Sequence, residues 1–389
     1  MAELGGGVAC RFCAGSDGAV VLDLGEQPAG DRFPAQDDSS ADPLHPLRMW
    51  MCRGCGLAQL AEDPTTPEEP RAVEPEAMVR QARDAVARAG AAGLLPVGGT
   101  VREFGSPHGG SWLGLLAERG LREVGGAERA TVVVDCIGVM HEEDQAAGLR
   151  RRVDVLAPGG VLLVEFHAFA AIVESMQWNA LRHGHFAYYS VTALVEMLAS
   201  VGLETTHGFW FDLYGGTVML AARRADEPGP RDRRSVDALL AEDVRVGATE
   251  PGRASALGRA ADASAQGLRR HLLDARSAGH RVLGYGAASR AVALLHRARI
   301  DVDLLPMIAD ASPAKHGRRM PSTSIPIRAP HEIVAQQPDE VILFVMDLLD
   351  DVRTAMPEVE AAGGRWVVVD PDVKVVEPTT VGRGGSRSA

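Results

Sequence analysis

Two cysteine pairs near the N-terminus constrain the fold of this chain more than any other feature. Cys10 and Cys13 form one Cys-x-x-Cys pair, and Cys52 and Cys55 form the second, 38 residues later. Each pair can present both sulfurs to one tetrahedral Zn²⁺ at about 2.3 Å, and four thiolates leave no open coordination position. We therefore expect a structural zinc ion in a module (residues 1–62) with little core of its own. Unligated thiols or two redox pairs are the alternatives.

The composition restricts the remaining possibilities. The chain has 389 residues, of which 46% are hydrophobic and 24% charged, enough for two or three cores. Five cysteines, four of them in the two pairs, fit a reducing compartment, and we expect a cytoplasmic protein. A net charge of −12 repels a phosphate backbone, which excludes nucleic acid as a partner. No apolar run reaches the roughly 18 residues of a membrane span, so no membrane contact is expected.

Strand and helix patterns alternate in two separate regions, residues 93–224 and 280–378, which predicts α/β sheets in both. A linker and entry helix (63–92) precede the first region. A second linker and bridging helices (225–279) connect the two, and a tail (379–389) is expected to be disordered. In the second region we expect a strand over 304–310 and a helix over 349–362.

Three stretches together resemble the zinc-containing sugar C-methyltransferases of antibiotic deoxysugar pathways. They are the cysteine pairs, residues 156–165 running into 177–190, and residues 284–290 with 310–318. The resemblance implies a zinc module, a methyltransferase-like (Rossmann-like) core, bridging helices and a C-terminal α/β Rossmann-like domain. It also implies that S-adenosylmethionine (SAM) methylates a carbanion beside the keto group of a nucleotide-linked 4-keto sugar, after a histidine has removed the proton.

A pair of histidines is the candidate for that proton transfer. His183 and His185 flank one glycine, and a histidine pKa lies near neutrality and shifts easily. The family motif is Tyr-His-Glu-His, so the resemblance puts the base on His185. Arg182 stands at the tyrosine position, where a guanidinium could hold an enolate oxygen, and Gly184 replaces the glutamate. Tyr188 completes the candidate catalytic set; two ordinary helix-end histidines are the alternative.

The cofactor-binding pattern is incomplete. SAM needs a glycine-rich turn after the first strand and an acidic residue after the second. Gly105, Gly109 and Gly110 supply the turn and Glu123 is the candidate acid, but Pro107 removes an N–H donor from the same turn. One βαβ unit of roughly 30 residues is missing before the strand over 131–135. SAM binding is therefore doubtful.

The start of the second α/β region predicts a site for the phosphates of a nucleotide-linked substrate. Glycines after a strand, a helix N-terminus and basic side chains suit a diphosphate. Tight packing of the strand on the helix is the alternative explanation of the glycines. The candidate residues are Gly284, Gly286, Ser289, Arg290 and Lys315.

Three functions are compatible with these features. The truncated core and altered histidine motif slightly favour an acid/base enzyme that uses His185 for epimerisation, elimination or cyclisation without SAM. The family resemblance favours an active SAM-dependent C-methyltransferase. A non-catalytic partner protein is the third possibility, and two retained histidines count against it.

Overall fold

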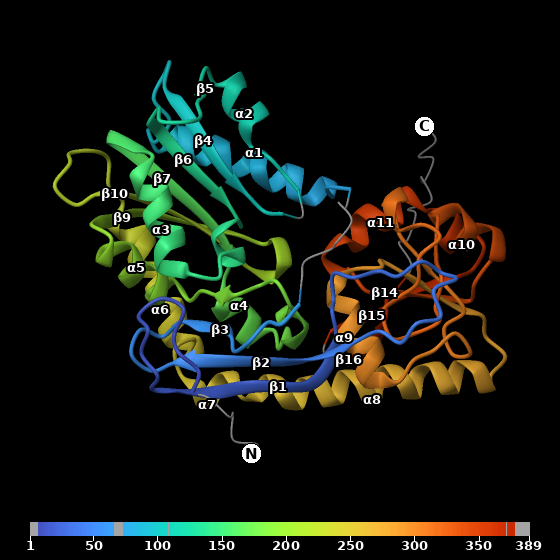
Figure 1. The fold of residues 1–389 in the computed structure, drawn as a ribbon. Helices are drawn as coiled ribbons and strands as arrows, with labels where there is room; N and C mark the ends of the chain where they lie inside the picture. Colours follow the sequence, from blue (N-terminus) through green and yellow to red (C-terminus); the bar gives the residue numbers. More distant parts are fainter. Residues whose placement is uncertain (1–6, 66–72, 108, 371, 378–389) are drawn as a thin grey trace, which may run out of the picture.

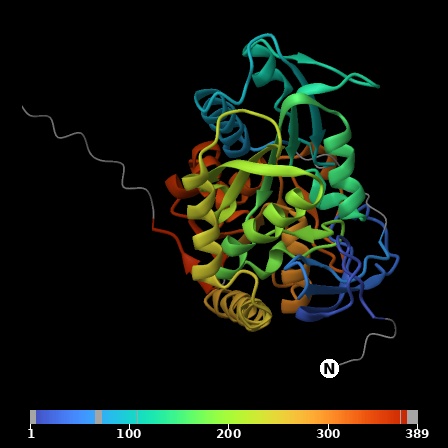
Figure 2. The ribbon, with the colours of Figure 1, turned by 90° about the vertical axis from the view of Figure 1, so that its left-hand side faces the viewer.

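The computed structural model describes residues 7–65, 73–107, 109–370 and 372–377, whose strands form three sheets. Figure 1 shows an N-terminal module (blue), a central core (cyan to green) and a C-terminal domain (orange to red). In Figure 2 the module and the long helix α8 (Ala256–Ser277) lie side by side below the core. No helix among these described residues is both long and apolar enough to cross a membrane.

The N-terminal sheet is antiparallel, and its last strand comes from the core. The order is β1 (Gly18–Pro28), β2 (Leu44–Cys52), β3 (Ala58–Leu60) and β8 (Ala187–Tyr188). Successive β2 side chains point to opposite faces: Met49 and Met51 join one apolar cluster, while Trp50 and Cys52 join a cluster shared with the core. The module therefore packs directly against the core.

The core contains a six-stranded sheet in the order β5-β4-β6-β7-β10-β9. The first four strands are parallel, β10 is antiparallel to β7, and β9 is antiparallel to β10. The strands are β4 (Thr100–Gly105), β5 (Arg122–Glu123), β6 (Ala130–Cys136), β7 (Leu156–His167), β9 (Leu203–Phe211) and β10 (Thr217–Arg224). The helices are α1 (Glu76–Ala91), α2 (Leu113–Glu118), α3 (Gln145–Asp154), α4 (Phe169–Glu174) and α5 (Val191–Ser200). Helices α1 and α2 cover one face, and α3 and α5 cover the other.

The core sheet ends at β5, which agrees with the prediction that a βαβ unit is missing before the strand over 131–135. Among the described residues between β4 and β6, the chain forms α2 and the two-residue strand β5. Residues 124–129 then lead directly into β6. No further strand lies beyond β5 in the described part of this sheet.

Three bridging helices lead from the core to the C-terminal domain. They are α6 (Arg233–Val246), α7 (Pro251–Ala254) and α8. The C-terminal sheet has the order β13-β12-β11-β14-β15-β16, with only β16 antiparallel to its neighbour. Its strands are β11 (Val282–Tyr285), β12 (Ile308–Ala309), β13 (Ile327–Arg328), β14 (Glu340–Leu343), β15 (Arg365–Asp370) and β16 (Asp372–Val375). Its helices are α9 (Ser289–Ala298), α10 (Pro330–Gln336), α11 (Leu349–Ala355) and α12 (Glu358–Ala361).

Two elements of this domain differ from the sequence prediction. The helix expected over 349–362 is interrupted between α11 and α12 at Pro357, which has no N–H to continue the helical hydrogen bonds. The strand expected over 304–310 shrinks to the two residues of β12. The tail expected to be disordered, 379–389, lies outside the described residues.

Candidate active site

The four paired cysteines converge on one point. Their sulfur atoms all lie within 4.8 Å of one another. The Cys10–Cys55 and Cys13–Cys52 sulfur pairs are 3.5 and 3.7 Å apart, close to the roughly 3.8 Å edge of a tetrahedron with about 2.3 Å bonds. The residues therefore fit a zinc ion, and with four thiolates that ion has a structural role.

The two cysteine loops have the same backbone hydrogen bond. The Cys10 carbonyl accepts from the Ala14 N–H, and the Cys52 carbonyl accepts from the Gly56 N–H, each at 3.0 Å. Ala14 and Gly56 both have a positive φ, of 58° and 73°. The left-handed conformation suits Gly56 and strains Ala14.

A cavity of about 1190 Å³ opens between the N-terminal module and the core. Its walls come from the turn after β4, the turn after β6 and the loop before β8. The lining residues are Asp31, Glu74, Phe104, Gly105, Ser106, Pro107, Gly109, Gly110, Ser111, Gly138, His141, Glu142, Arg152, His183, Gly184 and Phe186. This cavity contains two histidines and all three glycines of the predicted cofactor turn, so it is the candidate active site.

His141 is a cavity residue that sequence reasoning missed. It lies in a short 3₁₀ helix directly after β6, and its Nδ1 is 2.8 Å from the Gly184 carbonyl oxygen. A carbonyl only accepts, so Nδ1 carries the hydrogen and Nε2 the lone pair. Nε2 is 3.5 Å from the Ser106 hydroxyl oxygen. The available signal was a histidine just after a buried strand, at the sheet edge where α/β proteins bind ligands.

His183 is the second histidine of the cavity wall. Its side chain is buried, and Nε2 is 3.2 Å from the Pro46 carbonyl oxygen, so Nε2 carries the hydrogen. Its buried Nδ1 has no hydrogen-bond partner among the described residues. Burial lowers the His183 pKa, which keeps the imidazole neutral near pH 7.

His185 lies beside His141, outside the set of described lining residues. The two rings meet edge to face with centroids 4.6 Å apart. Arg182 places its Nε 2.9 Å from His185 Nε2 and donates from Nη1 to the Ser289 hydroxyl at 2.6 Å. Arg182 therefore orients His185 and links it to the start of α9, a role that the sequence did not predict.

Tyr188, the fourth predicted catalytic residue, is buried in β8. Its hydroxyl accepts from the Arg182 N–H at 3.2 Å and is 3.3 Å from the Ala180 carbonyl oxygen, to which it donates. Burial raises the Tyr188 pKa. This hydroxyl supports the histidine loop and does not line the cavity.

The cofactor turn fits only part of SAM. Gly109 and Gly110 have positive φ values, and Gly105 forms a bridge with Ile137, so the turns after β4 and β6 are in contact. Glu123, the predicted ribose-binding acid, is exposed on β5 and lies outside the set of described lining residues. No described residue of β5 lines the cavity, so Glu123 does not supply the acid that the ribose of SAM needs there.

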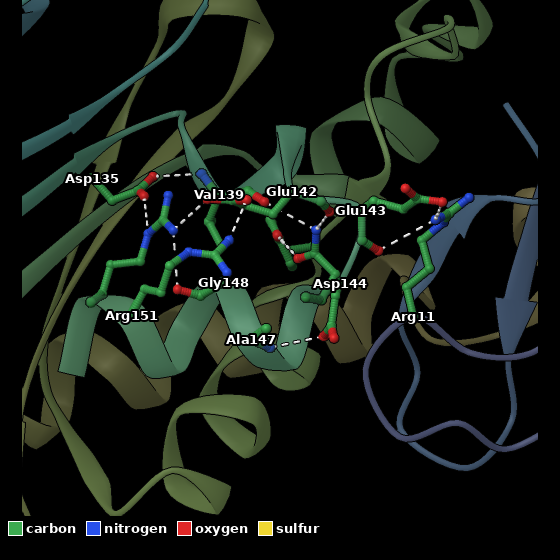
Figure 3. A network of polar contacts seen from close by, with 12 residues as sticks. Arg11, Asp135, Val139, Glu142, Glu143, Asp144, Ala147, Gly148 and Arg151 are labelled. Carbon is green, nitrogen blue, oxygen red and sulfur yellow. Dashed lines mark hydrogen bonds and ion pairs between the residues drawn. The ribbon is translucent and has the colours of Figure 1, made fainter. Parts of the chain in front are cut away.

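A buried ion pair lies beside the cavity, which Arg152 and Glu142 line. Figure 3 shows the network of polar contacts around Asp135 and Glu142. Arg152 donates from Nε to Asp135 at 2.7 Å and from Nη1 to Glu142 at 2.7 Å, and its guanidinium stacks on Phe104. The other Asp135 oxygen accepts from the Gly138 and Val139 N–H groups at 2.8 and 3.0 Å. The pair thus fixes the turn that precedes His141.

The predicted phosphate-binding residues make contacts within the C-terminal domain. Arg290 pairs with Asp347 at 3.0 Å, and buried Lys315 donates to the Ala287 carbonyl at 2.8 Å. A Cβ on Gly284 would lie 2.7 Å from Ile308, so tight packing explains that glycine. With Gly286 and Ser289, these residues lie outside the set of described residues that line the large cavity.

Two known sequence families match this chain. Residues 212–371 match the C-methyltransferase C-terminal domain, and residues 10–69 match a zinc binding domain. C-methyltransferase NovU from Streptomyces niveus is 25% identical over 419 residues, covering 94% of this chain and 96% of NovU.

Solved methyltransferase structures resemble part of the chain. The 1,6-didemethyltoxoflavin-N1-methyltransferase of Burkholderia thailandensis is 13% identical, with a TM-score of 0.28, and the match covers 44% of this chain and 96% of that protein. Magnesium protoporphyrin IX methyltransferase from Synechocystis is 10% identical, with a TM-score of 0.29, covering 39% and 84% of the two chains.

Proposed function

We propose that this chain, which is similar to zinc-binding C-methyltransferases, is a biosynthetic enzyme that removes a proton next to a carbonyl group without transferring a methyl group. The observation that carries this proposal is the pair His141 and His183, which line one large cavity and whose rings are each oriented by a backbone carbonyl. Abstraction of such a proton requires a neutral imidazole within reach of the carbon.

The roles that we propose for the histidines follow from their contacts. A backbone carbonyl orients each of the rings of His141 and His183, and Nε2 of His141 lies 3.5 Å from the Ser106 hydroxyl oxygen at the cavity. His185, the base implied by the family motif, accepts from Arg182 and supports His141 from the side. We therefore propose His141 as the base, with Ser106 as a partner in the proton transfer, and assign positioning to His183, His185 and Arg182.

The enolate formed by proton removal needs a hydrogen-bond donor for its oxygen. Among the described lining residues, the basic side chains are those of two histidines and Arg152, and only the arginine is always charged. Its Nε and Nη1 donate to Asp135 and Glu142, and no described residue accepts a hydrogen bond from Nη2. This group is suited to polarising the carbonyl oxygen of a substrate.

Because Glu123 lies away from the cavity, we favour a reaction that ends with reprotonation or loss of a leaving group. Epimerisation, elimination and cyclisation all start from the same enolate and need no methyl donor. The substrate that we propose is a small carbonyl compound of natural-product metabolism. Because of the similarity to NovU, a nucleotide-linked keto-deoxysugar is the first compound to test. We further propose a cytoplasmic enzyme without nucleic-acid or membrane partners.

SAM-dependent C-methylation of a nucleotide-linked 4-keto-deoxysugar is the second candidate. Gly105, Gly109 and Gly110 line the cavity, which leaves room for the methionine part of SAM at this turn. This reaction would begin with the same proton removal, and its product would be a methylated sugar together with S-adenosylhomocysteine.

Deuterium exchange separates the two candidates. The enzyme is incubated in D₂O with a nucleotide-linked 4-keto-6-deoxy sugar, and mass spectrometry follows deuterium at the carbon next to the carbonyl. We expect exchange without SAM, its loss in His141→Gln and His183→Gln, and no S-adenosylhomocysteine when SAM is added. Formation of a methylated product would replace our proposal with the second candidate, and absence of both exchange and methylation with every keto-sugar nucleotide would refute both.

A further inference from the structure

Arg11 stands between the cysteines of the first pair and reaches away from the metal site toward the candidate active site. Its side chain is 12% exposed. Nε donates to the Leu60 carbonyl at 3.1 Å, and Nη1 donates to the Glu143 carbonyl at 3.3 Å. The guanidinium also lies 4.7 Å from the centroid of the Phe186 ring. One side chain thus contacts both segments that carry histidines.

The backbone of Arg11 makes contacts in the same direction. Its N–H donates to the Gln59 side chain at 2.8 Å, and its carbonyl accepts from the Gln145 N–H at 3.1 Å. Gln145 is the first residue of α3, and Gln59 lies in β3. Hydrogen bonds therefore hold both the backbone N–H and the backbone carbonyl of Arg11, which fixes the direction of its side chain.

The two segments that Arg11 contacts are also joined to each other. Phe186 directly follows His185 and donates its N–H to the Met140 carbonyl at 2.8 Å. Next to Met140, His141 is bound through Nδ1 to the Gly184 carbonyl. A shift of Phe186 or Glu143 therefore moves His141.

The contacts continue from Glu143 into the cavity wall. Figure 3 shows Arg11 beside Glu143 and, along the same turn, Glu142 reaching the arginines of α3. Glu142 accepts from Arg152, which pairs with Asp135 below the turn that leads to His141. A continuous series of contacts thus joins the first cysteine pair to the candidate active site.

The second cysteine pair supplies an internal comparison. Arg53 follows Cys52 just as Arg11 follows Cys10, so both arginines place positive charge beside the thiolates. Arg53, however, is 53% exposed and binds Asp17 at 2.9 Å and the Gly18 carbonyl at 3.3 Å. Neither contact leads to a segment that carries a histidine. Both arginines can therefore affect the metal site through their charge, but only Arg11 connects it to the histidine segments.

We propose that Arg11 is a positioning residue that transmits the geometry of the zinc site to His141 and His185. This rests on the proposed function, in which His141 takes the proton and His185 positions His141. Without the guanidinium, the Leu60 and Glu143 carbonyls lose their donor and Phe186 loses its contact. The histidine segments then sample positions that are wrong for catalysis, and a displacement of about 1 Å can cost about 10²-fold in rate.

The test compares Arg11→Met with the matched Arg53→Met in the full zinc-loaded chain. The first readout is the NMR spectrum of the ¹³C-labelled histidine side chains, recorded without substrate. The resonances of His141 and His185 are assigned through single His→Gln variants. We expect their resonances and pH titrations to move in Arg11→Met and to stay in Arg53→Met, while zinc content stays at one ion per chain in both. This readout needs no activity, so it decides about Arg11 even where the proposed reaction is wrong.

The second readout is the rate of proton exchange as a function of pH. We expect kcat to fall about tenfold or more in Arg11→Met with a smaller change in KM, an altered pH profile, and partial rescue by Arg11→Lys. If Arg11→Met is insoluble, the NMR spectra are recorded on Arg11→Lys instead. A single ammonium group cannot contact Leu60, Glu143 and Phe186 together as the guanidinium does, so this variant should also shift the resonances. Unchanged His141 and His185 resonances in the soluble Arg11 variant, or equal changes in the Arg53 variant, would overturn the proposal.

Discussion

Replacing Glu165 by glutamine should stabilise the folded chain, and more so at higher pH. Glu165 lies in β7, is 5% exposed and accepts a hydrogen bond from the Gln81 amide. Burial raises the Glu165 pKa from 4.5 to about 7; the Gln81 bond opposes the increase and the nearby Asp135 adds to it. Glutamine keeps an oxygen for the bond from Gln81 and has no charge to bury.

The sign and size of the effect follow from proton linkage. The unfolded chain releases the Glu165 proton near pH 4.5, whereas the folded chain keeps it up to about pH 7. Folding therefore becomes less favourable as the pH rises through this window. The resulting penalty is about 3 kcal/mol at pH 8 and about 1.5 kcal/mol at pH 5.5, and Glu165→Gln should recover these amounts.

Urea unfolding of the two chains at pH 8 and pH 5.5, followed by tryptophan fluorescence, measures the difference. Glu196→Gln on the exposed face of α5 is the control, and it should leave the pH dependence unchanged. A gain that is equal at both pH values, or no gain at pH 8, would refute the assignment of this pH dependence to Glu165.

Three further predictions concern the metal site and the buried ion pair. Ala14→Gly should stabilise the chain by about 0.5–1 kcal/mol, because it relieves a left-handed alanine, and Gly56→Ala should destabilise it; thermal unfolding with zinc bound measures both. Metal analysis should find one zinc ion per chain, and Cys52→Ser should lose zinc and solubility, so a soluble zinc-free variant would contradict a structural role. Asp135→Ala should cost about 3–5 kcal/mol in urea unfolding, because it removes the fully buried carboxylate that pairs with Arg152, and a loss below about 1 kcal/mol would contradict that reasoning.

The features that sequence predicted best are those with local causes. A Cys-x-x-Cys spacing brings two sulfurs together within one tight turn, so Cys10 and Cys52 were recognisable without knowledge of the fold. Similarly, the helix over 289–298 and the shortened link between β4 and β6 follow from short-range patterns and from length.

The features that sequence could not predict depend on contacts between distant segments. His141 comes 42 residues before His183, and only the packing of two loops against the module puts both in one cavity wall. Lys315 was expected on a phosphate-binding loop, yet its ammonium group lies over the Phe33 ring from the N-terminal module. No periodicity or motif encodes either contact.

The position of β8 explains why an enzyme of this kind keeps a metal that takes no part in the chemistry. In the four-stranded sheet, Ala58 pairs with Tyr188 and Gln59 with Ala187. A slip of one residue in this pairing would turn every β8 side chain to the opposite face, and the two-residue strand has few hydrogen bonds of its own to prevent it. A zinc ion held by the four cysteines would fix the loop between β2 and β3 to the loop that carries Arg11, and Arg11 lies over the ring of Phe186, directly before β8. We therefore expect the folding free energy supplied by the metal to help set the register of the strand that follows His185.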